Sequence, residues 1–187
     1  VLAKQVVQGS LSADTLSFDE MMYGATLTPS LEEKAGIYEA ATKKGTNWTA
    51  HNNLGAVYIA QAIENPSNAS AMADKALAQL EIAARINEAP EVHANLASVQ
   101  MLKGNAYAAY NHASKALNSG LRGENAAGVN GVKGASEIVK AQYAAAVTSE
   151  SAATDNADNL FNKGLAQVLN KDYQNALTSF SEATSKN

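Results

Sequence analysis

The sequence has 187 residues, with 14 Lys and Arg against 18 Asp and Glu, a net charge of -4 and no Cys. The lack of Cys excludes a disulfide framework, a thiolate metal site and a Cys nucleophile, and the scattered Lys exclude the clustered positive charge that nucleic-acid binders need. No apolar run approaches the roughly 20 residues of a membrane span. The high Ala content and the low number of Pro, only three, favour an all-α chain.

The chain starts at Val1, without Met or a signal peptide, so we interpret it as a processed or trimmed piece. We expect residues 1–16 to form a linker or a leading helix, and residues 17–187 to form the folded domain. Ser17-x-x-Glu20 and Ser30-x-x-Glu33 are capping boxes, and each predicts the start of a helix.

Apolar periodicity and turn residues predict a series of helices along the domain. They are expected near residues 17–26, 30–44, 48–62, 70–87, 90–103, 106–118, 126–140, 142–152, 156–170 and 172–185. Pro90 suits a first helical turn, and Gly120 and Gly123 break the chain. The segment Ile63–Ser70, which contains Asn65-Pro66, is expected to be a longer loop between two paired helices.

An internal repeat organises these helices in pairs. Residues 132–154 align without a gap with residues 162–184, so that Gly134 matches Gly164. The first helices carry a small residue at one matched position, namely Gly55, Ala97, Gly134 and Gly164. The second helices carry Ala at two matched positions, namely Ala76, Ala109, Ala146 and Ala176, then Ala83, Ala116, Ala153 and Ala183. We expect the small residues to mark helix crossings rather than a nucleotide-binding loop.

This pattern resembles the tetratricopeptide repeat (TPR) family, whose unit is a helix-turn-helix with small residues at the crossings. The resemblance implies an all-α fold, a right-handed α-solenoid of about five units. The chain departs from the family at Lys133 and Lys163, where the family usually has Leu.

In the family, the first helix of each unit lines a concave groove, which implies a candidate binding stripe on this chain. Ten residues form this candidate stripe: Asn52, Ala56, Ile59, Ala94, Ser98, Met101, Ala135, Ile138, Phe161 and Leu165. Within a helix they are three or four residues apart and so share one face. The stripe carries no charge, so we expect it to take an apolar or helical segment of a partner, unless a neighbouring helix already fills the groove. The convex face and Ile63–Ser70 remain alternatives.

No catalytic motif occurs: there is no GxSxG elbow, no HExxH and no P-loop. The hypothesis that the chain is a small hydrolase is therefore supported by no motif. His51 and His93 take matched positions in successive units, and with His112 they are expected to be packing residues. A metal site would need further ligands converging on them. We therefore predict no catalytic residues, no metal and no cofactor.

The function predicted from these observations is a non-catalytic scaffold that binds a protein or peptide partner, with no nucleic acid and no membrane span. Residues 16–44, leading into Asn53–Tyr58, are similar to repeat segments that follow OmpA-like domains in bacterial envelope proteins. That similarity implies a periplasmic, outer-membrane-associated location. The alternative is a glycan- or nutrient-binding module built on the same repeats, which would use exposed aromatic platforms.

Overall fold

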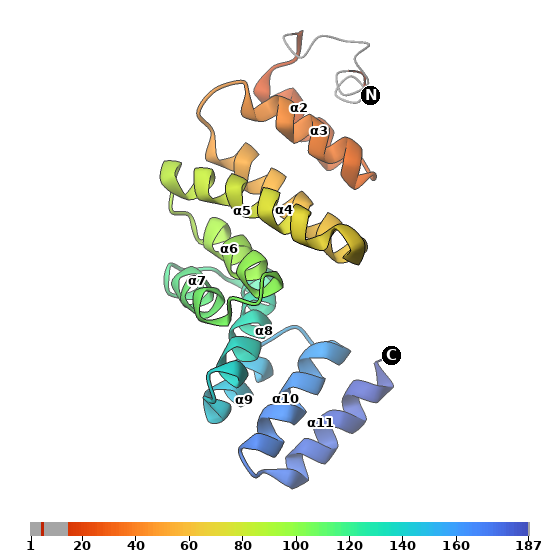
Figure 1. Ribbon diagram of the computed structural model, residues 1–187, viewed down its shortest axis with the longest axis vertical. Coiled ribbons are helices and arrows are strands. Elements are labelled where there is room, and N and C mark those ends of the chain that lie inside the picture. The colour runs from red at the N-terminus through yellow and green to blue at the C-terminus, as the bar shows by residue number, and fades with distance from the viewer. Residues whose placement is uncertain (1–4, 6–14, 187) are drawn as a thin grey trace. The chain divides into compact units, whose positions relative to one another are not determined.

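Figure 1 shows the computed structural model, which describes Gln5 and residues 15–186. Every regular element in this part of the chain is a helix. The chain divides into two compact units, residues 1–88 (unit 1) and residues 89–187 (unit 2). The leading segment expected at residues 1–16 lies almost entirely outside the described residues.

The helices of unit 1 pack in chain order, each on the one before it. They are α2 (Phe18–Thr26), α3 (Leu31–Thr42), α4 (Trp48–Glu64), the 3-10 turn η2 (Pro66–Asn68) and α5 (Ala69–Ile86). The largest fully buried side chains of the unit are Met21, Ile37, Leu54 and Leu80. The closest packing joins α4 and α5, because Ala76, Leu80 and Ala83 on α5 are fully buried.

Unit 2 consists of three helix pairs that stack on one another. They are α6 (Pro90–Leu102) with α7 (Ala106–Asn118), α8 (Gly123–Val139) with α9 (Tyr143–Ser151), and α10 (Ala157–Leu169) with α11 (Tyr173–Ser185). The first helices also contact one another in succession, α6 with α8 and α8 with α10. This stacking of helix pairs confirms the predicted solenoid-like helical-repeat fold.

Helix starts follow the sequence signals closely. The capping box at Ser17 is complete: its hydroxyl accepts from the Glu20 N–H at 3.2 Å, and the Glu20 carboxylate accepts from the Ser17 N–H at 2.8 Å. Ser30 likewise accepts from the Glu33 N–H. Pro90 takes the first helical position of α6, where its missing N–H costs nothing.

The expectation of a longer loop at Ile63–Ser70 is wrong. Ile63 and Glu64 end α4, Pro66 starts the 3-10 turn, and α5 begins at once at Ala69. The extra residues of this repeat lengthen its two helices to 17 and 18 residues, against 13 in α6 and in α7. The short turn suffices because the Asn65 N–H still bonds to the Gln61 carbonyl, and Pro66 has no N–H to satisfy.

The small residues of the first helices do lie at crossings within a pair, as predicted. A Cβ atom added to Gly55 would lie 2.6 Å from Cγ of Leu80 on α5, and one on Gly164 would lie 2.7 Å from a ring carbon of Phe180 on α11. Ala97 packs instead in a cluster with Ala113 of α7. The residue that faces each crossing lies on the second helix of the pair, four positions after the first matched Ala. This facing residue is large where the first helix has Gly at the crossing, and it is small where the first helix has Ala.

The turns between the two helices of each of the last three pairs share one geometry. Gly104, Ala141 and Lys171 each adopt a positive φ, of 75°, 58° and 64°. In each turn the next residue bonds back across five positions, as from the Asn105 N–H to the Gln100 carbonyl at 2.8 Å. This is the Schellman ending of a helix, in which Gly is the favoured left-handed residue.

Candidate functional site

The part of the candidate stripe that falls in unit 1 is mostly packed inside that unit. Asn52, Ala56 and Ile59 all lie on α4. Asn52 and Ile59 are buried, while Ala56 is half-buried. Little of this section is therefore open to a partner.

Unit 2 carries the other seven stripe residues, and six of them are half-buried. These six are Ala94, Ser98 and Met101 on α6, Ala135 and Ile138 on α8, and Leu165 on α10. Because α6 contacts α8 and α8 contacts α10, the structure places these residues on successive neighbouring helices. Ala94 also packs against the buried cluster that holds Leu121 and Val129, so the more accessible section begins at Ser98.

Phe161 lines a different feature from the other stripe residues. The residue is 54% exposed, and its ring lies 5.5 Å, centroid to centroid, from the ring of Phe180 on α11. The two rings border a cavity of about 500 Å³ whose other lining residues are Ala157, Asp158, Ala183 and Thr184. Phe161 therefore faces its own helix pair at this point.

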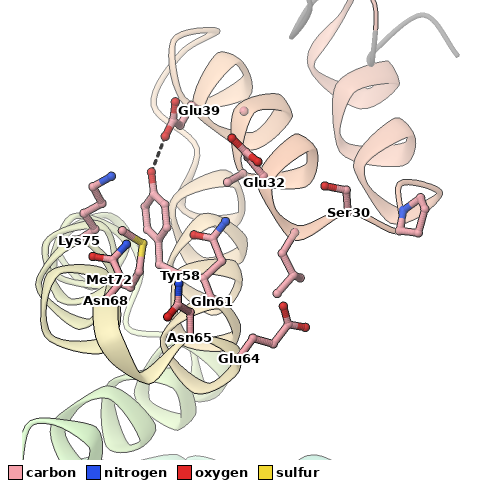
Figure 2. Close-up of a pocket in the computed structure, with 14 residues that line it drawn as sticks. Ser30, Glu32, Glu39, Tyr58, Gln61, Glu64, Asn65, Asn68, Met72 and Lys75 are labelled. Atoms are coloured by element: carbon pink, nitrogen blue, oxygen red, sulfur yellow. Dashed lines mark hydrogen bonds between the residues drawn. The ribbon is translucent and has the colours of Figure 1, made fainter.

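A larger hollow, which we call the unit 1 cleft, lies among α3, α4 and α5 and has a volume of about 820 Å³ (Figure 2). Polar side chains dominate its lining. From α3 and its cap come Ser30, Glu32 and Glu39, from α4 and its end Tyr58, Gln61, Glu64 and Asn65, and from η2 and α5 Asn68, Met72 and Lys75; Pro29, Leu31, Ala35 and Gly36 complete it.

Tyr58 is the one aromatic side chain that lines the unit 1 cleft. Its hydroxyl donates a hydrogen bond to the Glu39 carboxylate, as Figure 2 shows. The ammonium group of Lys75 lies 5.5 Å from the centre of the Tyr58 ring. Burial, followed by the hydrogen bond to Glu39 and its negative charge, raises the pKa of Tyr58 above its ordinary value. The phenol therefore stays protonated and holds Glu39 in place at neutral pH.

One wall of this cleft belongs to a segment that the sequence singles out. Ile63–Ser70 is an alternative contact segment, and its residues Glu64, Asn65 and Asn68 line the cleft; the residues on α3 and the rest of the lining are not predicted. The signal that was available is helical spacing: Glu32 and Glu39 are seven residues apart on α3 and share one face.

The histidines join the two helices of a pair. Nδ1 of His51 on α4 lies 2.8 Å from the side-chain oxygen of Gln79 on α5. Nδ1 of His93 on α6 lies 3.0 Å from Nδ1 of His112 on α7. Among the described residues, no group of three or more His, Cys, Asp or Glu converges as metal ligands would.

A buried polar cluster explains the unusual Lys133. Its ammonium lies 2.7 Å from the Glu137 carboxylate and donates to the Ser149 hydroxyl at 3.0 Å. Glu150, only 4% exposed, lies over Gly134 on the facing helix. Burial raises the pKa of Glu150 to about 8; the amide of Asn162 lowers it and the charge of Glu137 adds to the rise. Lys133, at a position where the resemblance implies Leu, thus pairs with the buried carboxylate of Glu137.

No helix in the described part of the chain is long and apolar enough to cross a membrane. A scan against protein-family models finds no match, and a sequence search among curated proteins finds none either.

Comparison with solved structures gives the fold. The chain is similar to YrrB, a TPR protein with an unusual peptide-binding site, at 18% identity over 97% of this chain and 92% of that one, with a TM-score of 0.67. It is similar to MamA at 14% identity over 98% and 91%, with a TM-score of 0.64. A TPR protein from Parabacteroides merdae matches at 14% identity over 98% and 70%, with a TM-score of 0.61. The chain therefore has the fold of tetratricopeptide repeat proteins.

Proposed function

We propose that this chain is a non-catalytic scaffold that binds a protein partner through the unit 2 section of the candidate stripe. The observation that supports the proposal is that Ser98 and Met101 lie on α6, and Ala135 and Ile138 on α8, two helices that contact each other. These side chains are half-buried, carry no charge and lie on helices in mutual contact. A half-buried apolar surface can still gain by being covered, because its remaining apolar area would leave water.

The chemistry of this surface favours an apolar segment, such as one face of a partner helix. Met101 is flexible and polarizable, which suits contact with varied apolar side chains. Because no charge is involved, we expect affinity to depend little on salt. That YrrB is described as having a peptide-binding site supports the same class of partner for this chain.

The non-catalytic part of the proposal rests on how the candidate acid-base groups are used. His51 bonds to Gln79, and His93 faces His112 across their helix pair. Both arrangements link packed helices, which supports a structural role for the imidazoles.

Two matched pairs of substitutions test the proposal. Peptides selected from a displayed random library on the intact chain would serve as ligands. Met101→Lys and Ile138→Lys should abolish their binding, because a charge would enter an apolar contact. The neighbouring residues Leu102 and Val139, 44% and 66% exposed, are the controls, and Leu102→Lys and Val139→Lys should leave binding intact.

Two results would contradict this proposal. If no selected peptide lost affinity in Met101→Lys or Ile138→Lys while these variants kept their helical spectrum, the contact surface would lie elsewhere. If both variants lost most of their stability to urea, the stripe would already be filled by packing.

We also infer a periplasmic, envelope-associated location, which rests on the similarity of residues 16–44 alone; fractionation of the native host cell tests it. The glycan-binding alternative would need clustered aromatic side chains. The exposed tyrosines Tyr23, Tyr107 and Tyr173 lie on α2, α7 and α11, in three different helix pairs.

A further inference from the structure

We propose that the unit 1 cleft among α3, α4 and α5 binds an extended segment of a partner protein that carries Lys or Arg side chains. The surface is distinct from the candidate stripe: none of its lining residues belongs to the stripe. Binding at this cleft would be a second mode of protein binding. An experiment can therefore contradict this inference while the proposed function of the candidate stripe stands.

The charges around the cleft set the chemistry of its ligand. Three carboxylates line it, those of Glu32, Glu39 and Glu64, against one cation, Lys75. They come from two helices, α3 and α4, and so face the hollow from two sides. Such a charge distribution attracts cationic groups and repels anionic ones. It therefore favours a partner segment rich in Lys or Arg over one rich in Asp or Glu.

Lys75 shows that the cleft already accommodates an ammonium group. Its Nζ lies 5.5 Å from the centre of the Tyr58 ring, within the range of a cation–π contact. The hydroxyl of the same ring holds the Glu39 carboxylate. Tyr58 itself is buried, so a second Lys or Arg head group from a partner would pair with the Glu39 carboxylate that Tyr58 holds and with Glu32 and Glu64.

The rest of the lining suits a peptide main chain and the apolar stems of long side chains. The amides of Gln61, Asn65 and Asn68 can both donate and accept, as the N–H and C=O groups of an extended segment require. Leu31 and Met72 supply apolar contact for Lys or Arg methylene groups. The volume, about 820 Å³, has room for several side chains, since ligand pockets run from about 300 to 1,000 Å³.

The test uses a defined probe, a fluorescent peptide of alternating lysine and alanine residues, titrated against the intact chain at low salt. Its counterpart, with glutamate in place of lysine, is the control ligand. Glu39→Gln keeps an acceptor for Tyr58 but removes the charge, and it should weaken binding about two- to fivefold. Lys75→Ala should strengthen binding by a similar factor, because it removes a competing cation.

Glu81→Gln is the matched control variant. Glu81 is exposed, lies on α5 like Lys75 and does not line the cleft. Its loss should leave the affinity unchanged, and the glutamate peptide should not bind.

Three outcomes would overturn this inference. One is an equal loss of affinity in Glu81→Gln and Glu39→Gln, which would mean attraction to the net charge of the chain. Another is weaker binding in Lys75→Ala. The third is no binding of the lysine peptide at all. Met101→Lys should bind the lysine peptide as well as the unaltered chain does, so failure of the stripe and failure of the cleft are told apart.

Discussion

Leu80 on α5 fills the space directly over Gly55 on α4, and a Cβ atom at Gly55 would lie 2.6 Å from its Cγ. Leu80 is fully buried, and the backbone carbonyl of Ala76 lies 3.3 Å from the same Cβ position, so a side chain at Gly55 meets both a packed side chain and backbone. The pair fixes how closely the first and second helices of this repeat approach, and the same relationship recurs between Gly164 and Phe180.

This contact predicts that Gly55→Ala destabilises the chain, although Ala favours helix over Gly by about 1 kcal/mol. Overpacking should outweigh that gain and cost about 1–3 kcal/mol of unfolding free energy. Gly164→Ala should cost less, because Phe180 is half-buried and borders a cavity into which its ring can turn. Urea unfolding of the two variants gives the comparison.

The crossing that has Ala in place of Gly on the first helix provides the control. Ala97 and Ala113 occupy the corresponding crossing of α6 and α7, so Ala97→Gly should destabilise by about 1 kcal/mol through helix propensity. Equal stability of Gly55→Ala and the unaltered chain would contradict the account of these crossings.

Glu150 predicts a dependence of stability on pH. Its folded pKa of about 8 lies above the ordinary value of a carboxyl group, so the folded state holds the proton more tightly than the unfolded state does. The stabilisation is complete below the unfolded pKa and is lost as pH rises toward 8. The groups near Glu150 are Glu137 on the facing helix α8, with its partner Lys133, and Asn162 on α10.

Glu150→Gln should remove most of this dependence, since Gln stays neutral. The unfolding free energy of the variant should exceed that of the unaltered chain near pH 9 and approach it near pH 5. Glu182→Gln, at an exposed position on α11, should keep the original slope. A stability that rises from pH 5 to pH 9 would be incompatible with a neutral Glu150.

The turn at Ala141 predicts a stabilising substitution to glycine. Ala141 has a φ of 58°, which costs an L-residue about 1–2 kcal/mol. Ala141→Gly should therefore raise the unfolding free energy by about 0.5–1 kcal/mol, after the entropy that Gly loses on folding. Gly104→Ala, at the matched turn, should lower it, and thermal melts that move both variants in the same direction would refute the assignment.

The helix pairs were predictable because the small residues recur in phase, and the helix starts because Ser17, Ser30 and Pro90 are strong local signals. The rest depended on contacts that are distant in sequence. Ala141 reads as a helix former, and only the turn geometry shows its left-handed backbone. The size match between Gly164 and Phe180 was visible only once the pairing of α10 with α11 was known.

The candidate stripe was placed by family resemblance, and the structure spreads it over surfaces of different kinds. Ile59 is packed inside unit 1, Phe161 borders its own cavity, and Ser98 and Met101 stay half-buried on α6. The unit 1 cleft escaped prediction because α3, α4 and α5 each contribute only a few of its polar groups.

We expect partners to be bound by the first helices of unit 2. Chemical-shift mapping can locate the bound surface, with the isotope-labelled chain and an unlabelled peptide selected on it. The largest shifts should fall at Ser98, Met101, Ala135 and Ile138 on α6 and α8. Shifts concentrated on α7, α9 and α11, with these four residues unmoved, would contradict the claim.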